Sequence, residues 1–288
     1  MAHKQILATI TALALVTMAC GFSFNLPINR IETGPIVEEE IQVAIPEGEE
    51  ATRLFIGFGA GELTLEPGAQ EWLVQGKSSY NLAALKPVVR ESGGIIRLES
   101  GELEIGGIPD FGDKLINRWD LQLANVPMNL EIAAGAYQGK MELGGLSLVS
   151  LEVSDGAAES VISFSEPNQV VMETLRYKTG ASSVRLNKLA NANFETLIFK
   201  GGAGDYQLDF SGDLQRDATV VVDAGMCTMT VVVPVGVNTR LLFDSGLANV
   251  DVFGDWKKSG EDYYLEGEGA TLTINVNLGA GKLILQNE

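Results

Sequence analysis

The chain has 288 residues, 33 of them glycine, and its 38 acidic against 20 basic side chains give a formal net charge of −18. Such a charge repels the phosphates of nucleic acid and anionic lipid, and no basic stripe interrupts it, so a nucleic-acid partner is excluded. The length is enough for one or two domains with a sizeable core.

Residues 1–20 have the pattern of a bacterial signal peptide. Lys4 precedes an apolar run over 6–19, which is too short and too rich in threonine for a comfortable membrane span. The run ends in the sequence TMAC, which resembles a lipobox and implies that Cys20 is acylated and begins the mature chain. We expect a membrane-anchored protein of the cell envelope, outside the cytoplasm; the alternative is an ordinary secretory signal with a chance cysteine.

Two regions of different character follow. Residues 21–50 contain three prolines and two runs of glutamate, which predicts an acidic tether, although the alternation over 41–45 would also suit a first edge strand. Residues 51–125 are predicted to form an N-terminal β region.

A glycine flanked by alternating apolar residues recurs eight times, mostly between 126 and 288. Apolar or aromatic residues stand five and three positions before each glycine, and in most copies four and six positions after it. The intervals between five successive pairs of these glycines are 21, 24, 22, 23 and 21 residues. The glycines are Gly59, Gly135, Gly156, Gly180, Gly202, Gly225, Gly246 and Gly279.

A period of about 22 residues predicts an all-β fold, a β-helix-like solenoid in which each repeat forms one rung. A rung of this length spans about 70 Å at roughly 3.3 Å per residue, enough for a closed coil of three short strands. An antiparallel meander is the alternative, but the dipeptides at these glycines are mostly not those that two-residue hairpin turns prefer.

The residue after the glycine is alanine in six copies, with Met226 and Leu247 in the others. Small residues here indicate a sharp corner, where a side chain would clash or φ must be positive.

Within residues 126–288 the period is broken once, between Gly246 and Gly279, which are 33 residues apart. The excess lies in 253–269 and predicts an inserted hairpin. Insertions in solenoids form loops that often bind ligands. Trp256, Tyr263 and Tyr264 are therefore candidates to stack on sugar rings, or alternatively to cover the open end of the solenoid as a cap.

The last repeat strand ends three residues before the C-terminus, and no polar capping unit follows it. An open final rung would expose unpaired backbone and apolar core. We expect the terminal strand to be covered either by the 253–269 hairpin or by the N-terminal region.

Short motifs in the N-terminal β region have a recognisable pattern of glycines and alternating aliphatic residues; they are residues 53–65, 73–76, 80–81, 87–90 and 95–98. On these motifs, the segment from about 50 to 105 resembles the N-terminal half of the bacterial toast-rack domain family, and the repeats after 130 resemble the putative-adhesin β-solenoids. The resemblance implies an extracytoplasmic solenoid, often lipid- or membrane-anchored, with no catalytic residues to carry over.

Reactive groups are scarce. The only histidine, His3, lies in the predicted signal peptide, so imidazole-based catalysis and histidine metal ligands are not expected, and Cys227 is expected to be a buried apolar residue. Carboxylates cluster at Asp205, Asp209, Asp213 and Asp217 without calcium-loop spacing.

We therefore predict a non-enzymatic cell-surface lipoprotein that acts as a binding or adhesion module for an unknown protein or glycan. No metal site or cofactor is predicted. The alternative is a structural or regulatory envelope protein with a membrane or signalling partner. A calcium-dependent carbohydrate-active enzyme is a remote third.

Overall fold

The computed structural model describes residues 30–31, 33–48, 50–101, 108–109 and 115–288. The chain divides into two compact units. In the smaller unit, the short strands β1 (Arg30–Ile31) and β7 (Ile108–Pro109) pair in parallel. The larger unit contains all the other described strands.

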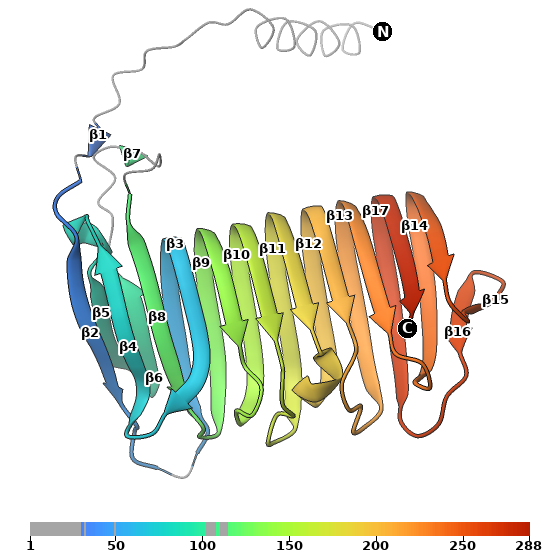
Figure 1. Cartoon of the computed structure of the whole chain (residues 1–288), viewed down its shortest axis with the longest axis horizontal. Helices are drawn as coiled ribbons and strands as arrows, with labels where there is room; N and C mark the ends of the chain where they lie inside the picture. The colour runs from blue at the N-terminus through green and yellow to red at the C-terminus, as the bar shows by residue number, and fades with distance from the viewer. Residues whose placement is uncertain (1–29, 32, 49, 102–107, 110–114) are drawn as a thin grey trace, which may run out of the picture. The chain divides into compact units, whose positions relative to one another are not determined.

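Each of the eight repeats forms one strand of 15–18 residues, and neighbouring repeat strands pair in parallel. The solenoid prediction is confirmed, and the antiparallel meander is excluded. The expectation of three short strands per rung was wrong. Each rung is one strand that rises along one face of the solenoid, bends at its glycine and returns along the other face (Figure 1). The strands are β3 (Thr52–Ala69), β9 (Met128–Glu142), β10 (Leu148–Ser163), β11 (Met172–Asn187), β12 (Phe194–Asp209), β13 (Ala218–Val233), β14 (Asn238–Phe253) and β17 (Thr271–Asn287).

We call the residues before the corner glycine the first arm of a rung and those after it the second arm. In β11, Leu175 and Tyr177 of the first arm and Val184 and Leu186 of the second arm are all buried. The first pair lies at odd and the second at even distances from Gly180. A straight strand would send the two pairs to opposite faces, and the bend turns both into the interior.

The corner requires glycine because neighbouring rungs approach closely there. A Cβ atom on Gly180 would lie 2.3 Å from the carbonyl oxygen of Gly156, and one on Gly202 would lie 2.4 Å from that of Gly180. None of the eight corner glycines has φ in the left-handed region. The sequence suggested that glycine is needed either because a side chain would clash or because φ must be positive, and the clash is the correct reason.

The rungs stack in chain order from β3 through β9 to β13, and then the order changes. β17 lies between β13 and β14, so that Val276 is opposite Val222 on one side and Phe243 on the other. The terminal strand is covered by β14, and neither of the two expected coverings was right.

At the N-terminal end, the two arms of β3 pair with separate sets of strands of the same sheet. The first arm pairs with β6 (Ile95–Ser100), which pairs antiparallel with β5 (Pro87–Ser92). The second arm pairs with β8 (Asn117–Ala124), followed by β4 (Trp72–Tyr80) and β2 (Val37–Ala44). Residues 37–44 of the expected acidic tether thus belong to the sheet. Two short 3-10 helices, η1 (Ala83–Leu85) and η2 (Leu189–Ala192), complete the described elements.

At the C-terminal end, residues 257–265 form a hairpin. β15 (Lys257–Ser259) pairs with β16 (Asp262–Leu265), which adds antiparallel to β14 over Thr239–Leu242. The hairpin therefore extends only the first-arm face of the solenoid.

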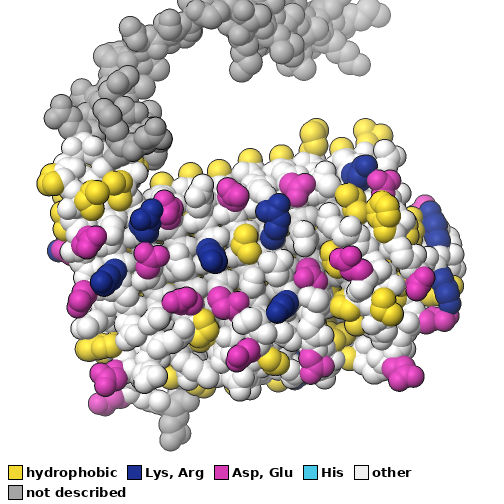
Figure 2. Space-filling model, in the orientation of Figure 1, with side chains coloured by type: hydrophobic (Ala, Val, Ile, Leu, Met, Phe, Trp, Pro, Cys, Tyr) yellow, Lys and Arg dark blue, Asp and Glu magenta, His cyan; other side chains and the backbone are white. Residues whose placement is uncertain are grey.

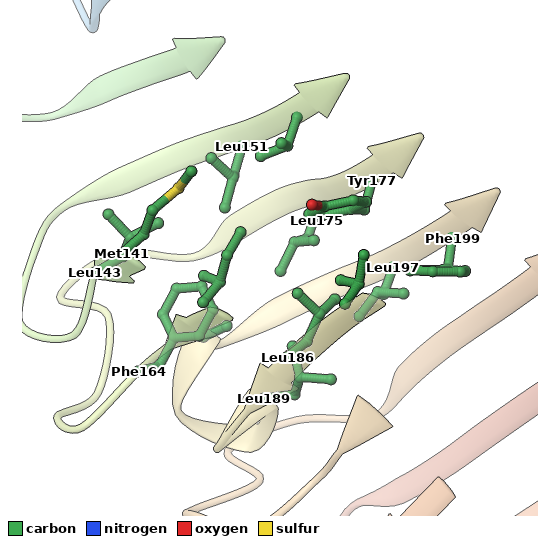
Figure 3. Packing of buried hydrophobic residues seen from close by; sticks show 14 of the residues in the cluster. Met141, Leu143, Leu151, Phe164, Leu175, Tyr177, Leu186, Leu189, Leu197 and Phe199 are labelled. Carbon is green, nitrogen blue, oxygen red and sulfur yellow. The ribbon is translucent and has the colours of Figure 1, made fainter. Parts of the chain in front are cut away.

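The core consists of apolar columns between the two arms. Leu151, Leu175 and Leu197 lie at the same level of three neighbouring strands and are at most 1% exposed (Figure 3). Burying each leucine contributes about 1.5–3 kcal/mol. The Tyr177 and Phe199 rings stack with their centroids 5.7 Å apart, so this level of the core is filled by aromatic contact.

Candidate functional site

Exposed apolar side chains lie in three places on the larger unit. A row of them follows the upper edge, where the rungs bend, a second group gathers at the end formed by β13, β17 and β14, and a third, with Ile36, Val37 and Val89, lies at the end formed by β2 and β5 (Figure 2). The row comprises the residues that follow the corner glycines, and we call it the corner ridge: Ala60, Ala136, Ala157, Ala181, Ala203, Met226, Leu247 and Ala280.

A groove of about 850 Å³ lies along the first four rungs of the corner ridge. Its lining is mainly alanine, with Tyr137 and Leu115 contributing larger apolar surface and Glu62 and Glu159 contributing carboxylates. Arg118 donates two hydrogen bonds to Glu62, of 2.9 and 3.0 Å, and these lower the pKa of the carboxyl. The groove therefore combines apolar surface with the Glu62–Arg118 ion pair and the carboxylate of Glu159.

The hairpin residues predicted from the sequence are brought together at the C-terminal end. Trp256 is 9% and Tyr263 6% exposed, and both pack into the core, whereas Tyr264 is partly exposed. The ammonium of Lys258 lies 5.1 Å from the Tyr263 ring centroid. Burial of two of the three rings favours the cap over the sugar-stacking alternative. Tyr264 alone of the three is not buried, and the ammonium of Lys257 lies 6.0 Å from its ring centroid.

The second arm of β14 exposes residues that the sequence-based search for a site did not select. Leu247 is 84% exposed, Phe253 56% and Val252 39%. The sequence did contain an indication of the exposed position at Leu247, because a leucine replaces the alanine that most repeats carry after the corner glycine. Phe253 gave no such signal, because its exposure depends on β14 being the last rung.

A cluster of hydroxyl groups surrounds Asp155 just inside the corner. Tyr177 donates a 2.7 Å hydrogen bond to Asp155, and Thr179 and Ser182 donate to the same carboxylate. Burial raises the pKa of Tyr177, and it raises that of Tyr137 in the neighbouring rung to about 12. Both phenols therefore stay protonated at neutral pH: Tyr177 stabilises the partly exposed Asp155 carboxylate, whereas Tyr137 donates to the Ser160 hydroxyl.

The acidic residues considered for calcium or lyase chemistry have structural roles or point to solvent. Asp209 accepts hydrogen bonds from the backbone and side chain of Ser211, and Asp217 accepts one from the Thr271 amide. Within the described part of the chain, no three His, Cys, Asp or Glu side chains are grouped to hold a metal ion. Burial raises the pKa of Cys227 to about 11, which keeps its thiol protonated.

The predicted lipidation site, Cys20, lies outside the described residues. None of the helices in the described ranges is long and apolar enough to cross a membrane.

Comparison with known proteins gives one family match. Residues 32–175 match the profile of the N-terminal domain of toast_rack, DUF2154. No curated protein matches the chain.

Among solved structures, a putative cell adhesion protein from Clostridium sporogenes is 19% identical, with a TM-score of 0.49 over 88% of this chain and 100% of that one. A putative adhesin from Parabacteroides merdae is 11% identical, with a TM-score of 0.36 over 89% and 98% of the two chains. A putative lipid binding protein from Parabacteroides distasonis is 9% identical, with a TM-score of 0.41 over 88% and 99%. Identities this low do not transfer a ligand.

Proposed function

Since the chain belongs to the toast-rack family, we propose that it is a non-enzymatic binding or adhesion module, held outside the cytoplasm by a lipid on Cys20. The observation that carries the binding role is the concentration of exposed apolar side chains on the corner ridge and at the β14 end. Exposed apolar patches on an otherwise charged surface mark interaction sites.

The chemistry of the described residues supports binding over catalysis. The tyrosines and the cysteine with strongly raised pKa values are at least partly buried and form internal contacts. A catalytic group needs an accessible position and a pKa near the working pH. To test for the remote alternative, the protein is incubated with acidic polysaccharides with and without calcium. We expect no unsaturated sugars, and their calcium-dependent release would establish a lyase.

The lipid anchor is tested separately. In a bacterial host, the protein should incorporate labelled fatty acid and partition into detergent, and Cys20→Ser should abolish both. A matched control is Cys227→Ser, which removes the other cysteine and should leave labelling intact. Labelled lipid that survives Cys20→Ser would show that the anchor is elsewhere.

A protein partner is favoured over a glycan, because Trp256 and Tyr263 are buried and Tyr264, the one partly exposed ring, already has the Lys257 ammonium 6.0 Å from its centroid. Because a structural or regulatory envelope protein would also bind a protein partner, that role is the second candidate function. Crosslinking on whole cells should recover a protein partner. Glycan binding that Tyr264→Ala abolishes, without any crosslinked protein, would reverse the preference.

A further inference from the structure

The outer edge of the second arm of β14 has no partner strand in the described structure. β14 pairs with β17 along its whole length, but β16 covers its other side only over Thr239–Leu242. Residues 247–253, which we call the free edge, therefore present unpaired backbone N–H and C=O groups.

The interior side chains beside the free edge are also incompletely covered. In β17, Leu283 and Leu285 are fully buried. Their counterparts in β14 are Val250, which is partly exposed, and Val252, which is 39% exposed. The core thus ends in apolar surface next to an unpaired strand, the combination that extended peptides recognise when they add to a sheet.

The other terminal strands of the larger unit carry charges that discourage such pairing. β2 has three consecutive glutamates over 38–40, β5 begins with Pro87 and carries Arg90 and Glu91, and β15 has two lysines at 257–258. Proline and charged side chains on an edge strand discourage pairing with other chains. The free edge has a single charge, Asp251, which is neutralised by Lys282 at 2.9 Å.

The hairpin limits what can occupy this edge. A second copy stacking as another rung would need the edges of both arms of β14, and β16 already occupies the first-arm edge over Thr239–Leu242. A single added strand needs only the second-arm edge. The position of the hairpin therefore argues against a stacked solenoid, whereas no described strand pairs with the outer edge of residues 247–253.

We propose that the free edge binds an extended segment of a protein partner by strand addition. Alternate apolar side chains of that segment face Ala248, Val250 and Val252, and the intervening residues are basic or polar. The basic character follows from the net charge of −18 and from the exposed carboxylates of Asp244 and Asp255 beside the edge. The proposal rests on the binding role proposed above and assigns it a location and a ligand class.

The test uses the purified full chain in detergent and a labelled, end-blocked heptapeptide in which valine alternates with lysine and threonine. Fluorescence anisotropy should show saturable binding, and a peptide with serine in place of valine should bind much more weakly. Two further probes carry N-methyl groups, one on the valines and one on the intervening residues. A strand offers only one of these two amide sets to its neighbour, so one probe should lose binding and the other should keep it.

Val250→Lys and Val252→Lys each place a charge on the apolar side of the free edge. Each should weaken peptide binding roughly tenfold or more, because strand addition would bury that charge without a partner. Thr230→Lys adds the same charge on the second arm of β13, between the uncharged Gln207 and Ile284, and should leave binding within about twofold. Thermal denaturation establishes that each variant is folded.

Equal binding of both N-methylated probes would overturn the proposal, as would undiminished peptide binding by folded Val250→Lys and Val252→Lys. A dimer in sedimentation that Val250→Lys dissociates would assign the edge to a second copy instead. A crosslinked partner that Val250→Lys retains would leave the binding role intact and place it elsewhere on the surface.

Discussion

Replacing the corner glycines by alanine tests whether the close stacking of rungs determines this fold. At Gly180, the new Cβ would lie 2.3 Å from the Gly156 carbonyl oxygen, and real Cβ atoms essentially never approach within 3.0 Å. The rungs must separate by about 0.7 Å there, although hydrogen bonding holds neighbouring strands at roughly 4.8 Å. Overpacking of this kind costs about 1–3 kcal/mol.

Gly59 is the matched control, because it occupies the same repeat position in the first rung and a Cβ there meets nothing within 4 Å. Gly59→Ala should be neutral or stabilising by about 0.4–1 kcal/mol, since alanine reduces the entropy of the unfolded chain. At Gly156, the corresponding contact is 3.1 Å, and an intermediate effect is expected.

Thermal unfolding followed by circular dichroism measures the series. A loss of about 2 kcal/mol at Gly180 corresponds to a fall in Tm of about 4–8 °C for a domain of this size. The expected order of Tm is Gly59→Ala, then Gly156→Ala, then Gly180→Ala. Equal Tm values for the first and last variants would show that glycine is not required by the neighbouring rung.

Phe199→Ala should cost about 3–5 kcal/mol in urea unfolding, because Phe199 is fully buried, whereas Phe253→Ala, at a 56% exposed site, should change stability by less than about 1 kcal/mol. Deleting residues 279–288 should unfold the whole solenoid, since β17 lies between two other rungs. In the intact protein, amide hydrogen exchange in this segment should be slow, and rapid exchange would contradict the interior position of β17. Burial raises the pKa of Tyr137 and Tyr206 from 10.0 to about 12, so the folded state holds these protons more tightly. Their stabilising effect is complete below about pH 10 and is lost as the pH rises through about 12, so tyrosinate absorbance should lag behind that of a free tyrosine until the fold is lost.

The candidate site shows where sequence reasoning stops. The insertion at 253–269 predicted a hairpin, and β15 and β16 form one. Alternation along β16 separates Tyr263 from Tyr264, but which ring faces the core depends on the register of β16 against β14. That register puts Tyr263 inside and Tyr264 outside, and the register could not be predicted from the sequence.

The sequence by itself determined the two arms of each rung and the corner between them, because these lie within one repeat, whereas the joining of both arms into one bent strand was seen only in the structure. The spacing of leucine, valine and phenylalanine around each glycine specifies two inward-facing arms and a corner between them. Only the tertiary structure decided the order of the last rungs. All the repeats have apolar residues at the same positions, so the apolar pattern of β17 fits beside either β13 or β14. This pattern therefore does not predict which strands β17 pairs with. The insertion before β17 provides the chain length to return between them, and this choice makes β14 the last rung and leaves its second arm exposed.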